Sequence, residues 1–232
     1  MGSALNSVMG GGGGGLLGAV GGIVGGIFGG PVGAMIGQAI GNMLQEAVGD
    51  AVKDAASQLS KEFGMPKFVA DLVNEAVRNA LKDSIKGSSP EADQLANQEF
   101  GDLMKDFSKD LAKQIVENTR KYMESARESE EGAKGGKAGG KASPKSWLEA
   151  IARAMGEVLG DKAAKLVELS NKISEVANAG GDDKAQAQAA KQMSALQSEM
   201  QGTSQMFSLL QNAFNNAIKS IGEGLSQMAR KG

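Results

Sequence analysis

The side chains of this chain that could do chemistry are mainly carboxylates, because the sequence contains neither histidine nor cysteine. Asp102, Asp106 and Asp110 follow one another at intervals of four residues, and the segment GGDDK occupies residues 180–184. Clustered carboxylates can transfer protons or bind a divalent cation. The four-residue spacing places the three aspartates on one face of a helix, so a solvated surface explains them better. GGDDK is too short to be a calcium loop by itself.

The missing residue types exclude the common catalytic mechanisms. Without histidine or cysteine, a nucleophile and a base cannot pair in the usual way, and zinc sites with nitrogen and sulfur ligands cannot form. Trp147 and Tyr122 are each the single residue of their type, and we interpret both as core anchors rather than ligand platforms. We therefore expect no enzymatic activity, no cofactor and no metal.

The charges are balanced overall but unevenly placed. There are 25 basic and 27 acidic side chains, which argues against a nucleic-acid partner. The first basic residue is Lys53, so a cleavable secretory signal peptide, which needs a basic beginning, is not expected. The uncharged start MGSALNSVMG fits an unfolded export signal, but its composition fits an ordinary disordered tail at least as well.

A glycine-rich apolar segment spans residues 16–45, after a flexible arm at residues 1–15. Glycines at every fourth position lie on one helix face and leave a groove in which another helix can pack closely. The alternative is a disordered low-complexity linker. The expected membrane or oligomer segment comprises the glycine row and its large apolar neighbours: Gly21, Gly25, Gly29, Gly33, Gly37, Gly41, Ile23, Ile27, Phe28 and Ile36.

Amphipathic helices are expected over residues 46–129. Gly64 interrupts the pattern, and an apolar stripe that begins with Phe68 and Val69 follows Pro66. Ser89 then precedes a proline and an acidic residue, which is typical of a helix start. Residues 130–144 alternate glycine and lysine and are interpreted as a linker.

The remaining residues, 145–232, predict an antiparallel, coiled-coil-like helical hairpin with its turn at 178–183. Glu199 is the only charged residue between Met193 and Ile218, so the last helix should pack on several neighbours. A buried core helix within one chain and a self-assembly face are both compatible with this pattern. The expected assembly face consists of Met193, Leu196, Met200, Phe207, Leu210, Phe214, Ile221 and Met228.

These features together predict an all-α protein, and they resemble proteins secreted by bacterial type III machinery. The resemblance lies in the start MGSALNSVMGGGGGG, the apolar glycine-rich segment, the absence of cysteine and the low-charge helix KQMSALQSEMQGTSQMFSLLQNAFNNAIKSIGEGLSQMARKG. Harpins, translocators and extracellular filament subunits are the similar groups. The resemblance implies terminal helices that assemble into a coiled-coil tube in the filament subunits, and an apolar segment that acts on a membrane in the other two groups.

The functional expectation is a secreted, non-enzymatic protein that acts by membrane insertion or self-assembly. It would be cytoplasmic before export and then secreted or associated with a host membrane. The expected partners are copies of the same chain, membrane lipid and a secretion chaperone. The alternative is a soluble coiled-coil assembly or adaptor protein whose glycine arm is disordered.

Overall fold

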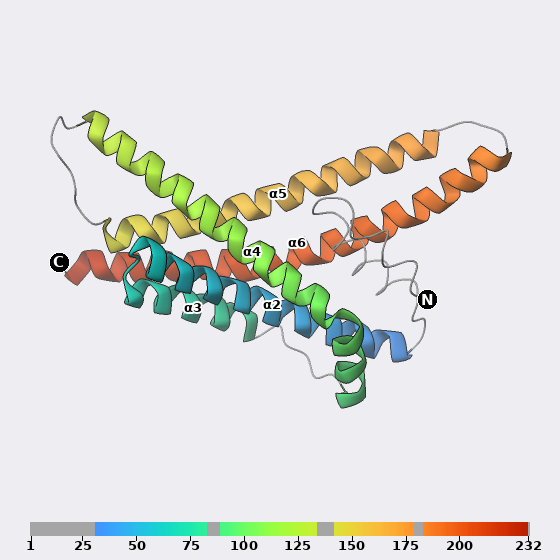
Figure 1. Ribbon diagram of the computed structural model, residues 1–232, viewed down its shortest axis with the longest axis horizontal. Helices are drawn as coiled ribbons and strands as arrows, with labels where there is room; N and C mark the ends of the chain where they lie inside the picture. Colours follow the sequence, from blue (N-terminus) through green and yellow to red (C-terminus); the bar gives the residue numbers. More distant parts are fainter. Residues whose placement is uncertain (1–30, 83–88, 134–141, 179–182, 232) are drawn as a thin grey trace. The chain divides into compact units, whose positions relative to one another are not determined.

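The computed structural model describes residues 31–82, 89–133, 142–178 and 183–231. All regular structure in these ranges is helical, so the expected all-α class is confirmed (Figure 1). The helices are α2 (Pro31–Phe63), α3 (Lys67–Lys82), α4 (Pro90–Ala133), α5 (Pro144–Asn178) and α6 (Asp183–Lys231). The expected arm at 1–15 and most of the expected linker, residues 134–141, lie outside the described residues.

Serine and proline together fix where two of the long helices begin. The first residue of both α4 and α5 is a proline, whose missing N–H costs no hydrogen bond at that position. The backbone N of Ala92 donates to Oγ of Ser89 at 3.2 Å. In the same way, the backbone N of Ser146 donates to Oγ of Ser143 at 3.1 Å. The helix start expected at Ser89 is therefore confirmed, and Ser143 caps the first turn of α5 in the same way.

A tight turn joins α2 to α3. Gly64 has a φ of +77°, which side chains with a Cβ rarely adopt, and it ends α2 as glycine commonly does. The backbone N of Met65 donates to the carbonyl O of Leu59 at 3.1 Å. Oγ of Ser60 donates to the carbonyl O of Met65 at 2.9 Å. The expected helix break at Gly64 is thus confirmed, and the two hydrogen bonds of Met65 hold the turn that follows it.

The helices contribute to two units. Unit 1 comprises Met1–Leu44, Lys86–Leu103 and Gly160–Leu209, and unit 2 comprises Gln45–Ile85, Met104–Leu159 and Leu210–Gly232. The helices α2, α4, α5 and α6 each contribute residues to both units. The expected boundary between residues 45 and 46 falls inside the single helix α2.

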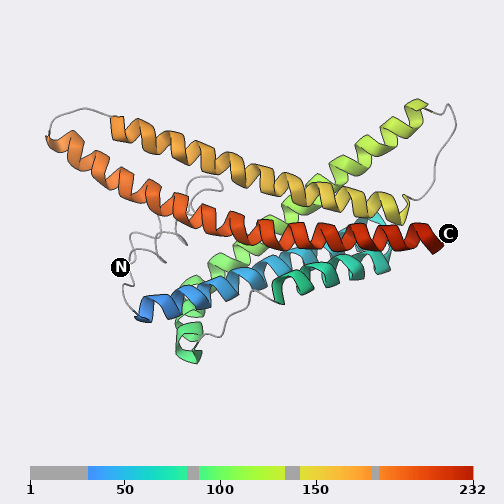
Figure 2. The same cartoon turned by 180° about the vertical axis from the view of Figure 1, so that it is seen from behind.

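Unit 2 holds most of the buried apolar side chains. Its segment of α2 runs antiparallel beside α3, and the start of α5 lies along the end of α6 (Figures 1 and 2). Many of the buried residues are alanines, which allow helix axes to approach closely. The largest side chains of this core that are almost completely buried are Leu59, Leu111, Ile115, Leu148, Ile151, Met155, Leu210, Phe214 and Ile221.

Unit 1 contains the far half of the expected hairpin, where α5 and α6 run antiparallel (Figure 2). Leu169 and Met206 are almost fully buried, with 0 % and 2 % of their surface exposed. Most of the other apolar side chains of this hairpin remain partly exposed: Leu166, Ile173, Val176, Met193, Leu196, Phe207 and Leu209. This half of the hairpin is therefore much less covered than its continuation in unit 2.

Candidate functional site

The expected assembly face of α6 has two different environments. Leu210, Phe214 and Ile221 are buried in the core of unit 2, so the alternative of a core helix within one chain holds for these three residues. In unit 1, Met200 is 39 % exposed. Three further members of the face, Met193, Leu196 and Phe207, are partly exposed, and the side chain of Met228 lies outside the described residues.

The facing helix α5 also carries an exposed apolar side chain. Val167 is 62 % exposed, the highest value among the large apolar side chains of the described residues. On the same helix, Nζ of Lys165 lies 3.7 Å from Oε1 of Glu199 on α6. The one acidic side chain in the low-charge stretch of α6 is therefore paired with α5.

The expected glycine-rich segment is described only in part. Gly21, Ile23, Gly25, Ile27, Phe28 and Gly29 lie outside the described residues. Gly33, Ile36 and Gly37 belong to the first turns of α2. A Cβ added to Gly41 would meet no atom within 4 Å, so no part of the described chain fills the groove there.

None of the described helices has the length and hydropathy needed to cross a bilayer.

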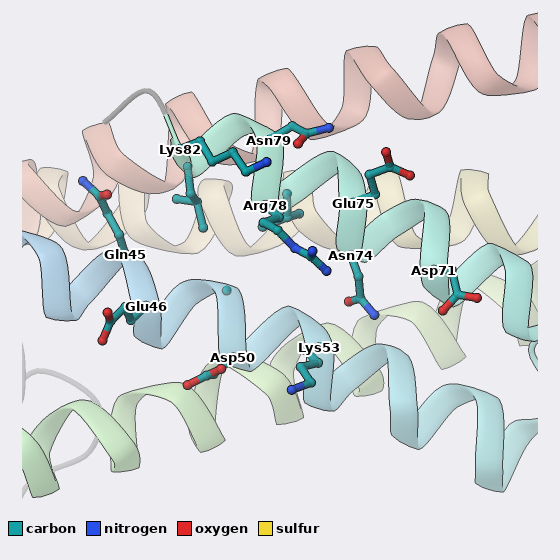
Figure 3. Close-up of a pocket in the computed structure, with 13 residues that line it drawn as sticks. Gln45, Glu46, Asp50, Lys53, Asp71, Asn74, Glu75, Arg78, Asn79 and Lys82 are labelled. Atoms are coloured by element: carbon teal, nitrogen blue, oxygen red, sulfur yellow. The ribbon is translucent and has the colours of Figure 1, made fainter. Parts of the chain in front are cut away.

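A charged groove with a volume of about 890 Å³ lies between α2 and α3 in unit 2. Asn74 and Arg78 extend from α3 toward α2 (Figure 3). The side-chain O of Asn74 is buried without a hydrogen-bond partner. The charged residues that line the groove are Glu46, Asp50, Lys53, Asp71, Glu75, Arg78 and Lys82, and their mixture of signs favours no single class of ion.

A smaller cavity of about 380 Å³ lies where α4 and α5 meet the turn between α2 and α3. The guanidinium of Arg120 stands 4.7 Å from the centre of the Phe63 ring, within the range of a cation–π contact. The same guanidinium lies 3.5 Å from the carboxylate of Glu124. The cavity is lined by Phe63, Gly64, Arg120, Met123, Glu124, Ala142 and Trp147. Trp147 is only 5 % exposed, in agreement with its interpretation as a core anchor.

Tyr122, the only tyrosine of the chain, lies beside two charged residues of α5. Burial raises the pKa of its hydroxyl, and the charge of Glu157 and a hydrogen bond to it raise that pKa further. The guanidinium of Arg153, 5.8 Å from the ring centre, acts in the opposite direction. The surroundings of Tyr122 therefore favour the neutral form of its hydroxyl.

The carboxylates considered first lie on the surface. Asp102, Asp106 and Asp110 are exposed on α4. In the part of the chain that the structure describes, no group of three or more carboxylates is placed to hold a metal ion. No family model, curated protein or solved structure matches this chain.

Sequence reasoning missed the end of unit 2 that carries the second cavity. The apolar stripe predicted that Phe68 is buried, but this prediction is wrong, because 51 % of its surface is exposed. At helical spacing Phe68 shares a face with Glu75 and Asn79, which are exposed, rather than with the buried Val73. The signal that could have been noticed is a phenylalanine on each side of the short turn GMP.

Proposed function

We propose that this chain is a non-enzymatic, exported helical protein that associates with copies of itself through the hairpin of α5 and α6 in unit 1. The observation that carries the proposal is that the burial of the apolar stripe changes along α6. Its apolar stripe is buried at Leu210 and Phe214 but partly open at Met193, Leu196 and Met200. An apolar stripe that continues beyond its core offers a surface on which another helix can pack.

The low charge of this face of α6 favours a second copy of the same hairpin as the partner that packs on it. Glu199 is the only charged residue of α6 between Met193 and Ile218, and its pairing with Lys165 neutralises it. A partner helix would therefore meet a nearly uncharged face, to which a second copy of the same hairpin is well matched. Helices with heptad stripes commonly associate in this way.

Export and membrane action rest on sequence features rather than on the hairpin. The uncharged start and the low-charge last helix resemble type III secreted proteins, which supports export. The open groove at Gly41 supports close helix packing of residues 16–45, in an oligomer or in lipid. A secretion chaperone before export is part of the same proposal. The alternative is an adaptor whose hairpin binds a different protein.

Sedimentation velocity of the full chain over a range of concentrations tests self-association. The double variant Val167→Ser/Met200→Ser should weaken association by about tenfold, since each change removes apolar surface from the interface. Leu95→Ser is the matched control, because Leu95 is also in unit 1, is 40 % exposed and lies on α4. A parent chain that stays monomeric at every concentration excludes self-assembly and leaves the adaptor alternative.

Deleting residues 16–45 tests the proposed membrane action separately. We expect the deletion to abolish leakage from lipid vesicles, or to reduce the size of the oligomer, if these residues pack in lipid or between copies. Unchanged leakage together with unchanged sedimentation contradicts any role for the segment.

A further inference from the structure

The charged groove between α2 and α3 has a regular order of charges along its two edges. Both helices contribute exposed charged side chains to its lining. In chain order these are Glu46, Asp50 and Lys53 on α2, and Asp71, Glu75, Arg78 and Lys82 on α3. The α2 edge therefore runs from two acidic residues to a basic one, and the α3 edge runs from two acidic residues to two basic ones.

Because α2 and α3 run antiparallel, residues at equal distances from the turn between them face one another across the groove. Glu46 thus lies opposite Lys82, and Asp50 lies opposite Arg78 (Figure 3). Lys53 lies opposite the part of α3 that carries its two acidic residues. Each edge of the groove is therefore the charge complement of the other.

The groove keeps these complementary charges apart. Within the described residues, none of the seven charged side chains of the lining forms an ion pair or a hydrogen bond. Between the edges the groove is lined by Gly49, Val77 and Leu81. A Cβ added to Gly49 would lie 3.6 Å from Cδ1 of Leu81, so this part of the groove is closely packed. The charges are therefore available to a surface that approaches from outside.

We infer that this groove pairs with the same groove of a second copy of the chain. A two-fold rotation about an axis along the groove places α2 of one copy on α3 of the other, with the order of charges along the axis unchanged. Glu46 of each copy then meets Lys82 of the other, and Asp50 meets Arg78. The helices of the two copies form an antiparallel bundle.

The symmetry also fixes the register of this pairing, because a pure rotation allows no shift along its axis. Each acidic–basic contact is made twice, once from each copy. A surface whose two edges are complementary to each other is complementary to itself after such a rotation. The alternating signs, which favour no single ion, therefore favour a second copy of the chain.

This surface is distinct from the assembly face of the α5–α6 hairpin. The residues that line the groove belong to unit 2, whereas the open part of the α6 stripe belongs to unit 1. The groove contacts are between exposed charges, so salt should weaken them, while the apolar contacts of the hairpin should persist. A chain that has two different surfaces for copies of itself can assemble beyond a dimer.

Sedimentation velocity of the full chain with Val167→Ser/Met200→Ser measures the groove pairing, because these changes weaken the hairpin association. This background chain should still dimerise at low ionic strength and should become monomeric at about 0.5 M salt. Asp50→Arg or Arg78→Asp, added singly, should weaken the dimer by at least about tenfold. Asp110→Arg, an exposed change on α4 that alters the net charge as Asp50→Arg does, should have no effect.

An equimolar mixture of the two single variants tests whether the contact is between chains. In a mixed dimer, the arginine introduced at position 50 of one chain meets the aspartate introduced at position 78 of the other, and the second contact is the native one. The mixture should dimerise about as tightly as the background chain. Circular dichroism of each variant checks that it folds, and Glu46→Lys with Lys82→Glu provides a second pair of variants if the first does not.

Three results would overturn the inference. The first is a background chain that is monomeric at low ionic strength or whose dimer is insensitive to salt. The second is a mixture that associates no better than either variant alone, even if Asp50→Arg/Arg78→Asp in one chain restores association, because the charges then act within one molecule. The third is rescue of Asp50→Arg by Lys53→Glu rather than by Arg78→Asp, because α2 then meets α2 instead of α3.

Discussion

The ammonium group of Lys165 on α5 lies 3.7 Å from the carboxylate of Glu199 on α6, and this ion pair joins the two helices of the exposed hairpin. Both side chains are less than one-third exposed, at 25 % and 22 %. Because Glu199 is the only charged residue in a long stretch of α6, the pair favours one register of α6 against α5. A shift of one helical turn would separate the ammonium group of Lys165 from this carboxylate.

A double-mutant cycle with Glu199→Gln and Lys165→Met should find a coupling free energy of about 0.5–1 kcal/mol. The pair is partly shielded from water, so the coupling should exceed that of the more exposed pair of Lys145 and Glu149 and should decrease at high salt. Urea unfolding followed by circular dichroism measures the free energies. Zero coupling at low salt would show that the pair does not hold the hairpin in register.

Truncation of apolar side chains on α6 should lower stability in unit 2 but weaken self-association in unit 1. Phe214→Ala removes a fully buried ring from unit 2 and should lower the free energy of unfolding by about 3–5 kcal/mol. Met200→Ala, at a position that is 39 % exposed, should change it by less than about 0.5 kcal/mol while weakening self-association. Urea unfolding at a concentration where the chain is monomeric, combined with sedimentation velocity, separates the two effects. Equal losses of stability would contradict the distinction between core and assembly face.

Local signals in the sequence determined much of the helical architecture. Ser89 and Ser143 cap helices because a serine followed by proline satisfies free N–H groups and supplies the φ of a first helical turn. Apolar periodicity identified the apolar stripe of α6 but left open whether it is a core or an assembly face, and Leu210, Phe214 and Ile221 lie in the core of unit 2. The same periodicity could not distinguish Phe214, which is buried, from Met200, which is not, because the pattern does not say where neighbouring helices end.

The candidate sites were less predictable, because they depend on contacts between distant segments. Nothing in the sequence pairs Lys165 with Glu199 or Arg120 with Phe63, since those contacts follow from how separate helices meet. Phe68 is exposed because it lies on the same face of α3 as the exposed Glu75 and Asn79, whereas the next residue, Val69, is buried.

Two glycine substitutions in unit 2 should change stability in opposite directions. Gly64→Ala forces a Cβ into a backbone with φ of +77° and should cost about 1–2 kcal/mol of unfolding free energy, although no atom lies within 4 Å. Gly156→Ala lies within α5 in open space and should add about 0.5–1 kcal/mol. Thermal unfolding of the two single variants measures both changes. A stabilising effect of alanine at position 64 would show that the turn is not fixed in the left-handed conformation.

Titration of Tyr122 tests the cluster that it forms with α5. Since it is the only tyrosine, the absorbance of tyrosinate follows this residue alone. Its pKa should lie above the ordinary value of 10.0, chiefly because of burial and then because of Glu157. A pKa that is raised on folding contributes stability below the unfolded pKa, and this contribution is lost as pH rises through the folded pKa. The stability due to this group should therefore begin to fall only above about pH 10.

Substitutions of the two charged neighbours of Tyr122 should shift its pKa in opposite directions. This difference separates the effect of the charges from that of burial. Glu157→Gln removes a negative charge and should lower the pKa of Tyr122 toward 10.0, although burial keeps it raised. Arg153→Gln removes a positive charge and should raise that pKa further. If both variants shift the pKa in the same direction, general exposure of the ring is the cause, and the charges of α5 do not control the titration of this tyrosine.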